Sequence, residues 1–362
     1  MGSAEGACRD VAGPLLHSGK LEPAAVALDH VADGERFYGT RTVTTSGSVL
    51  KPIARRALQA VGIVVALLGA GFVIRALVRD WPQVSALVAD ASLGWLLAAL
   101  GLGIFAMTGI ALVWTHELRR RTASVTATDG VSWYFIGELA KYVPGGIWSV
   151  IGRGELAVRG GVGRVDAYTS TFLSLGATFG AALVVALVSV PVHDGVVPLG
   201  LGRAGQAAIT FAILLVGTVG LLLASRLLPN APAVPGSQAG RERPIGLGAL
   251  QLRSVPLLLL LSIPVWLVLG ISTWMIAAGF GIRIPLSEAV FATSLAWFIG
   301  FVIVPVPGGI GVREAVLVWA LSSVSPGTAA AIAAVSRAIS MASDLMGAGV
   351  CAGIASLRER KR

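Results

Sequence analysis

The chain has 362 residues, of which 55% are hydrophobic and 13% charged, and its formal net charge is +9. Soluble domains carry about 25% charged residues, so this composition, with a mean hydropathy of +0.80, excludes a soluble globular protein and indicates an integral membrane protein. The basic residues stand in short clusters beside apolar stretches, which is typical of membrane topology signals and argues against a nucleic-acid partner.

The chain divides by composition into a polar tail, an apolar domain and a short basic end. Residues 1–50 contain no apolar core preceded by basic residues, so they are not a secretory signal, and we interpret them as a flexible tail. The transmembrane domain is predicted over 51–357, with halves at about 51–205 and 206–357, and residues 358–362 form the basic end.

Six stretches are apolar and long enough to cross a bilayer as helices, which takes about 20 residues each. The six predicted spans are 57–78, 92–114, 167–190, 206–228, 255–278 and 329–356. The last span of each half also carries two glycines four residues apart, Gly176/Gly180 and Gly349/Gly353, a spacing that predicts close helix packing.

Two further apolar stretches, 131–150 and 289–323, each contain the pentapeptide Val-Pro-Gly-Gly-Ile, at 143–147 and 306–310. Chance predicts only about 0.3 Pro-Gly-Gly tripeptides in a chain of this composition. Pro and Gly interrupt a helix, and an interrupted backbone is tolerated at membrane depth only beside protein or a watery cavity. Paired interruptions in the two halves are typical of a transporter substrate site.

The distribution of basic residues favours re-entrant, broken helices over full crossings. If both broken stretches return to the side they enter from, 17 basic residues flank the spans on the inner side and four on the outer side, as the positive-inside rule requires. Each half then has three crossings, so the second half is inverted relative to the first. We therefore expect an all-α polytopic protein with six transmembrane helices and two re-entrant helices in an inverted repeat. Both termini are expected in the cytoplasm.

Charged residues next to the two interruptions are the candidate substrate-binding residues. Glu138 and Lys141 are three residues apart, so they share a helix face and can form an ion pair. A helix that resumes near Ile147 would present free N–H groups to an anion, and Arg153 would add a planar donor, unless Arg153 is only a topology signal. The neighbouring aromatic residues Trp133, Tyr134 and Trp148 are interpreted as interface anchors.

The second interruption is followed by Arg313 and Glu314, which are adjacent and therefore expected to face different partners. Arg337 and Asp344 lie seven residues apart on the last span, and we expect them to pair with each other inside the bundle or to contact substrate. The full set of candidate substrate-binding residues is Glu138, Lys141, Pro144, Gly145, Gly146, Arg153, Pro307, Gly308, Gly309, Arg313, Glu314, Arg337 and Asp344.

The sequence gives no sign of a metal, a cofactor or a catalytic centre. The four histidines, at 17, 30, 116 and 193, lack metal-ligand spacing, and Cys8 and Cys351 are too few for a disulfide framework. The chain also lacks closely spaced acids and a phosphate-cradling loop with Lys-Ser/Thr. We expect neither a metal nor a cofactor, and no enzymatic activity.

At residues 137–148 with Arg153, and at 307–314, the chain resembles the lysylphosphatidylglycerol synthase transmembrane (flippase-like) family, over about 55–357. The resemblance implies a fold that moves a lipid between leaflets. It does not extend to the soluble synthase domain, for which this chain has no candidate segment, so synthesis of the lipid is not expected.

From this we expect a protein of the cell (inner or plasma) membrane that moves a polar or anionic-headgroup phospholipid, or a lipid-linked intermediate. The alternatives are a membrane-embedded lipid-linked transferase and a non-transporting partner of an envelope-synthesis complex. Protein partners compatible with these readings are a second copy of the chain and envelope-synthesis proteins.

Overall fold

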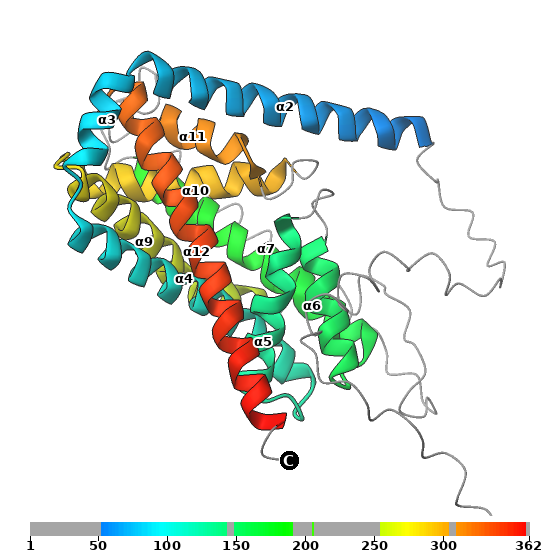
Figure 1. Cartoon of the computed structure of the whole chain (residues 1–362). Helices are drawn as coiled ribbons and strands as arrows, with labels where there is room; N and C mark the ends of the chain where they lie inside the picture. Colours follow the sequence, from blue (N-terminus) through cyan, green and yellow to red (C-terminus); the bar gives the residue numbers. More distant parts are fainter. Residues whose placement is uncertain (1–51, 143–147, 191–204, 206–253, 304–308, 360–362) are drawn as a thin grey trace, which may run out of the picture. The chain divides into compact units, whose positions relative to one another are not determined.

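The computed structural model describes residues 52–142, 148–190, 205, 254–303 and 309–359. Throughout these residues the secondary structure is helical, with ten α-helices and one 3-10 helix and without a strand (Figure 1). Predictions that fall on the remaining residues lie outside the described part of the chain. These include the tail 1–50, the predicted span 206–228, and the motif residues Pro144, Gly145, Gly146, Pro307 and Gly308.

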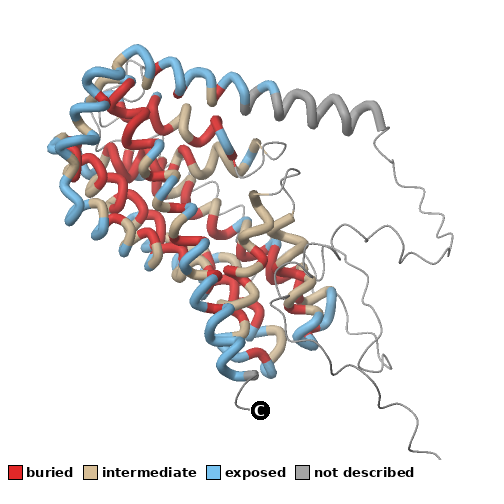
Figure 2. The backbone as a smooth tube through the Cα atoms, in the orientation of Figure 1, coloured by how far each residue is buried: buried red, intermediate tan, exposed pale blue. Residues whose placement is uncertain are grey.

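Four described helices have the length and apolarity of membrane spans: α4 (Leu93–Arg121), α7 (Arg164–Ser189), α9 (Val255–Gly279) and α12 (Pro326–Glu359). They coincide with the predicted spans 92–114, 167–190, 255–278 and 329–356. The long apolar runs are also rich in Ala and Leu, which favour helix. The predicted span 57–78 falls on α2 (Pro52–Arg79), whose described side chains include large exposed apolar residues such as Leu67, Leu68 and Phe72 (Figure 2).

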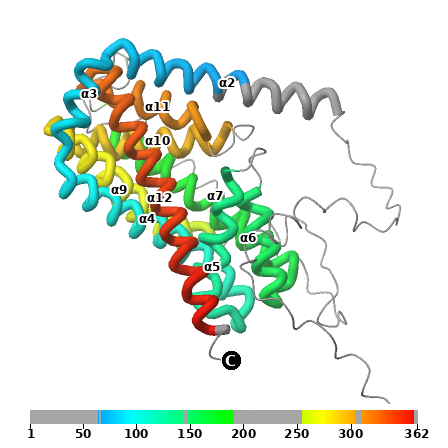
Figure 3. The backbone as a smooth tube through the Cα atoms, in the orientation of Figure 1, coloured from blue at the N-terminus to red at the C-terminus, as the bar shows by residue number. Residues whose placement is uncertain are grey.

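Shorter helices lie between the long ones. After α3 (Trp81–Ala89) and α4, the chain forms α5 (Ala127–Glu138), the 3-10 helix η1 (Leu139–Tyr142) and α6 (Trp148–Arg159); α5 and α6 pack against each other. In the same way α10 (Leu286–Val302) packs against α11 (Val312–Ala320). We call α5–η1–α6 the first hairpin and α10 with residues 309–320 the second hairpin (Figure 3). They correspond to the two stretches predicted to be broken.

The core lies where α4, α7, α9 and α10 meet (Figure 2). Trp114 and Trp266 are fully buried there, and each indole N–H donates a hydrogen bond to α7, to Thr171 Oγ1 at 3.0 Å and to the Thr178 carbonyl at 2.7 Å respectively. Many buried hydroxyls donate to the carbonyl one turn earlier, which satisfies them inside apolar helices. The polar residues of these spans are therefore compatible with burial.

Close helix packing depends on glycines other than those predicted. A Cβ at Gly176, Gly349 or Gly353 would meet nothing within 4 Å, so the predicted close-packing role is wrong for these three residues. A Cβ at Gly180, in contrast, would lie 3.1 Å from Leu259 Cδ2. Tighter approaches occur at other glycines, including one in the first hairpin, where a Cβ at Gly137 would lie 2.7 Å from the backbone nitrogen of Arg153.

Candidate functional site

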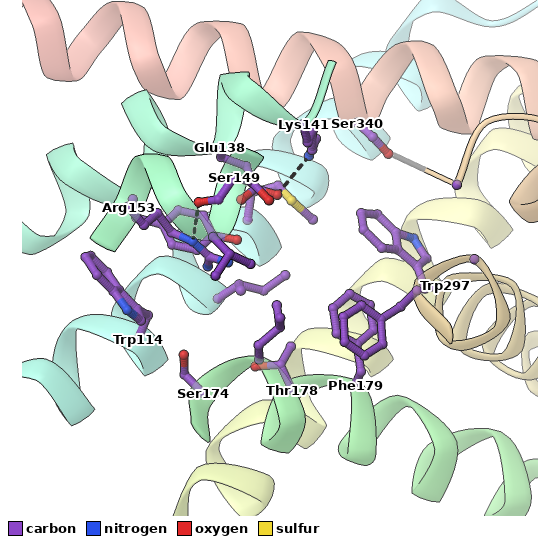
Figure 4. A pocket seen from close by; sticks show the side chains of 18 of the residues that line it. Trp114, Glu138, Lys141, Ser149, Arg153, Ser174, Thr178, Phe179, Trp297 and Ser340 are labelled. Carbon is purple, nitrogen blue, oxygen red and sulfur yellow. Dashed lines mark hydrogen bonds and ion pairs between the residues drawn. The ribbon is translucent and has the colours of Figure 1, made fainter. Parts of the chain in front are cut away.

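A cavity of about 320 Å³ lies between the two hairpins, with further walls from α4, α7 and α12. Figure 4 shows Glu138, Lys141 and Arg153 on one side of this cavity and Trp297 and Phe179 on the other. The first hairpin contributes Tyr134, Glu138, Lys141, Tyr142, Ser149, Val150 and Arg153 to the lining. The second hairpin contributes Trp297, Gly300, Phe301, Gly309 and Arg313.

Of the candidate substrate-binding residues, six line this cavity: Glu138, Lys141, Arg153, Gly309, Arg313 and Arg337. Glu314 and Asp344 are not in the lining but form ion pairs with lining residues. The same cavity is lined by residues that flank the two interruptions: Tyr142 and Ser149 at the first, and Gly309 at the second. The remaining five candidates lie outside the described residues.

Lys141 is the centre of a charged cluster at the first hairpin. Its ammonium lies 3.2 Å from Glu138 Oε1, as the three-residue spacing predicts, and 2.7 Å from Asp344 Oδ2 on α12. Tyr142 donates a second hydrogen bond to Asp344 Oδ2, also at 2.7 Å. Asp344 is fully buried, and a buried carboxylate needs such partners because desolvation of an unpaired charge is costly.

Asp344 therefore has a different partner from the one predicted. The expectation that Asp344 pairs with Arg337 is wrong. Asp344 binds Lys141 and Tyr142, whereas Nη1 of Arg337 lies 3.7 Å from Oε1 of Glu314. A seven-residue spacing places two residues on one face of a helix, but two full turns of α-helix separate them by about 10 Å. Partners on the facing hairpins are closer.

Arg153 is buried, with 2% of its surface exposed, and its guanidinium lies 4.9 Å from the centre of the Tyr134 ring. Its Nε–H donates to the Ser149 carbonyl at 3.3 Å. The arginine is held in place by the contact of α5 with α6, since Gly137 packs against its backbone. Arg153 thus lines the cavity instead of serving as a solvated topology signal, and Tyr134, 3% exposed, is a support for Arg153 rather than an interface anchor.

Arg313 is arranged similarly at the second hairpin. It is buried, its guanidinium lies 3.8 Å from the centre of the Trp297 ring, and Nη2–H donates to Ser340 Oγ of α12 at 3.0 Å. Gly300 on α10 packs closely against Arg313: a Cβ added at Gly300 would lie 3.3 Å from the Cβ of Arg313. A cation over an indole face is favourable, and the flat guanidinium suits this stacking.

Glu314 points to other partners than Arg313, as adjacency on a helix predicts. One carboxylate oxygen accepts the Gly311 N–H at 2.7 Å, and the other lies 3.7 Å from Arg337. Glu314 thereby caps α11, whose start also needs the positive φ angles of Gly309 (+66°) and Gly311 (+82°). The Glu314 carboxylate already accepts the N–H at the start of α11, so this N–H is not free to bind a substrate anion.

Two lining aromatics, Tyr134 and Trp297, were not among the predicted site residues. Each stands ten residues before the proline of its interruption, and Gly137 and Gly300 each stand seven residues before it. Had the two stretches been aligned on their prolines, this shared spacing would have identified both aromatic residues and both glycines. The lining also contains Trp114 of α4 and the stacked pair Phe179–Phe301, with ring centres 3.9 Å apart.

The chemistry available at the cavity is that of anion binding. Within the described residues, neither Arg153 nor Arg313 has a carboxylate at ion-pair distance; both are held by aromatic rings and neutral oxygens. Guanidinium groups of this kind bind phosphate or carboxylate with charge-assisted hydrogen bonds. Searching the described residues for three or more His, Cys, Asp or Glu in metal-binding proximity yields none.

The comparisons with known proteins agree with the resemblance seen in the motifs. No curated protein matches the chain. The family model described as lysylphosphatidylglycerol synthase TM region matches residues 59–345, a range that includes both hairpins and every residue that lines the cavity. This match spans most of the 362 residues, and the chain therefore belongs to the lysylphosphatidylglycerol synthase TM region family.

Proposed function

We propose that this protein moves a lipid with a phosphate-containing headgroup, or a lipid-linked intermediate, between the leaflets of the cell membrane. The observation that carries the proposal is the pair Arg153 and Arg313. They come from different hairpins, are both buried, line one cavity and lack a carboxylate partner among the described residues. A buried charge without a counterion is costly, so such a pair is best explained by an anionic ligand.

The size and lining of the cavity support this proposal. Its volume of about 320 Å³ lies within the range of small-ligand pockets, which suits a headgroup. The lining is largely apolar, with Phe172, Leu175 and Phe179 on α7 beside the charged groups. A polar headgroup would be held by the arginines while the apolar wall accommodates the first methylenes of the chains. The proposed process involves binding and movement and no covalent chemistry.

We further propose the topology of six crossings and two re-entrant hairpins in an inverted repeat. The helices α5, α6 and α11 contain 12, 12 and 9 residues. At 1.5 Å per residue they are about 18 Å or shorter, less than the roughly 30 Å of a bilayer core. The pairwise packing of the helices in each hairpin fits a return to the same side. With the positive-inside rule, the first hairpin enters from the cytoplasm and both termini are cytoplasmic.

A lipid-scrambling assay tests the proposed function. The purified protein would be reconstituted into vesicles that contain a fluorescent phospholipid, and dithionite quenching would report its movement. We expect the double variant Arg153→Ala/Arg313→Ala to lose most of the activity. The matched control, Arg159→Ala/Arg283→Ala, removes two exposed arginines outside the cavity and should keep it. Equal activity of the two double variants would remove the proposed site.

Cysteine labelling on intact cells tests the topology. In a variant with Cys8 and Cys351 replaced by serine, an impermeant maleimide should label Arg283→Cys, in the turn before α10, from outside. It should not label Arg159→Cys, at the end of α6, unless the membrane is opened. Labelling of Arg159→Cys from outside would show that the first hairpin crosses the membrane.

A further inference from the structure

The cavity contains more cationic groups than one phosphate needs. Its described lining includes four cationic side chains and one carboxylate, that of Glu138. Lys141 is engaged by Glu138 and Asp344, and Arg337 lies 3.7 Å from Glu314. Two guanidinium groups remain that, in the described chain, have no acidic partner.

These two groups come from separate hairpins and have different neighbours, so each is described as one subsite. Arg153 has its guanidinium over Tyr134 and uses Nε–H for the Ser149 carbonyl. Among the described residues its two terminal nitrogens have no hydrogen-bond partner, so they can bind a ligand. The first residues of α6, Ser149 and Val150, line the cavity beside it, and the N-terminus of a 12-residue helix favours an anion.

The second subsite has Arg313 and the ring on which it stacks. One terminal nitrogen of Arg313 is used by Ser340. The indole N–H of Trp297 is buried and lacks a hydrogen-bond partner within the described residues, although Trp297 lines the cavity. A buried donor without a partner costs free energy, which indicates that a ligand supplies the acceptor for this N–H. Figure 4 shows Arg153 and Trp297 on opposite sides of the cavity.

We infer that the substrate carries two phosphate groups, as in a lipid diphosphate, with one phosphate at Arg153 and the start of α6 and the other at Arg313 and Trp297. This inference rests on the proposed function and goes beyond it, because two phosphates would give each of the two guanidinium groups an anion of its own. Glu138, held by Lys141, would remain outside both phosphate contacts.

Calorimetric titration of the detergent-purified protein with two short lipids tests the inference. Geranyl diphosphate and geranyl monophosphate share one ten-carbon chain and differ in the number of phosphates. We expect the wild type to bind the diphosphate at least about tenfold more tightly, since charge-assisted hydrogen bonds to a second phosphate add to the affinity. Each single variant, Arg153→Ala and Arg313→Ala, should bind the two lipids within about threefold of each other. The control Arg283→Ala should behave as wild type.

The outcomes separate this inference from the proposed function. Equal binding of both lipids by the wild type, with binding lost in the double variant Arg153→Ala/Arg313→Ala, overturns the two-phosphate site and leaves a single-phosphate site. A diphosphate preference that survives in both single variants overturns it as well. Binding of either lipid that is unaffected in the double variant removes the proposed function itself. If a variant does not fold, the wild-type ratio alone decides between one phosphate and two.

Discussion

The substitution Gly137→Ala should damage the first hairpin, because the added methyl group would have no room. A Cβ at this position would lie 2.7 Å from the backbone nitrogen of Arg153 and 3.0 Å from its Cα, whereas ordinary contacts begin at 3.4 Å. The overlap of about 0.7 Å is with backbone, so a side-chain rotation cannot relieve it. On the other side, Gly152 packs on the Gly137 carbonyl. Helix α6 must therefore move away from α5.

Two opposing contributions determine how much Gly137→Ala changes the stability of the protein. Overpacking a tight contact costs about 1–3 kcal/mol. Replacing Gly by Ala in a helix returns about 1 kcal/mol, since glycine is the less favourable residue there. The expected net loss of stability is therefore up to about 2 kcal/mol, together with a displacement of Arg153 from the Tyr134 ring. The matched control is Gly176→Ala in α7, where an added Cβ meets nothing within 4 Å and only the helix gain remains.

Thermal unfolding in detergent, followed by intrinsic fluorescence, measures the stability difference, and the scrambling assay measures the effect on Arg153. Gly137→Ala should unfold at a lower temperature than wild type and have reduced activity, while Gly176→Ala should unfold at the same or a higher temperature with full activity. If the two variants have equal unfolding temperatures and equal activities, the close contact between α5 and α6 does not position Arg153.

Three further substitutions test other contacts of the site. Asp344→Asn should lower stability by about 3 kcal/mol, because it breaks the buried ion pair with Lys141. The control Glu155→Gln loses a more exposed ion pair with Arg164 and should cost less than about 1 kcal/mol. Equal effects of the two substitutions in thermal unfolding would contradict the argument from burial. Arg313→Lys keeps the charge but loses the flat stacking on Trp297 and should weaken phosphate-lipid binding in titrations, so unchanged affinity would show that charge alone suffices. Gly311→Ala, at φ +82°, should cost about 1–2 kcal/mol of stability, whereas Gly353→Ala, inside α12 and with room for the added Cβ, should not lower stability.

The sequence was informative about the fold because long apolar runs have few alternatives in a membrane. The predicted spans over α4, α7, α9 and α12 agree with the helices within a few residues, except at the end of α4, which extends further. The resumption of helix near Ile147 was likewise close to the observed start of α6 at Trp148. The exact membrane topology remains a proposal, since the apolar stretch 206–228 lies outside the described residues.

The candidate site was predictable where partners are close in sequence and unpredictable where they come from distant helices. The pair Glu138–Lys141 follows from helix geometry alone. The partner of Asp344 does not, because Lys141 is about 200 residues away and reaches α12 only in the folded chain. The stacking of Arg313 on Trp297 depends in the same way on how α10 and α11 pack.

A single helix, α12, provides partners to both hairpins: Ser340 for Arg313, Arg337 for Glu314, and Asp344 for Lys141. The two sides of the cavity are therefore not energetically independent, even though they are far apart in sequence. In a double-mutant cycle, Ser340→Ala and Asp344→Asn should show a coupling energy. Each substitution changes the position of helix α12, and this helix also holds the hairpin that the other residue contacts.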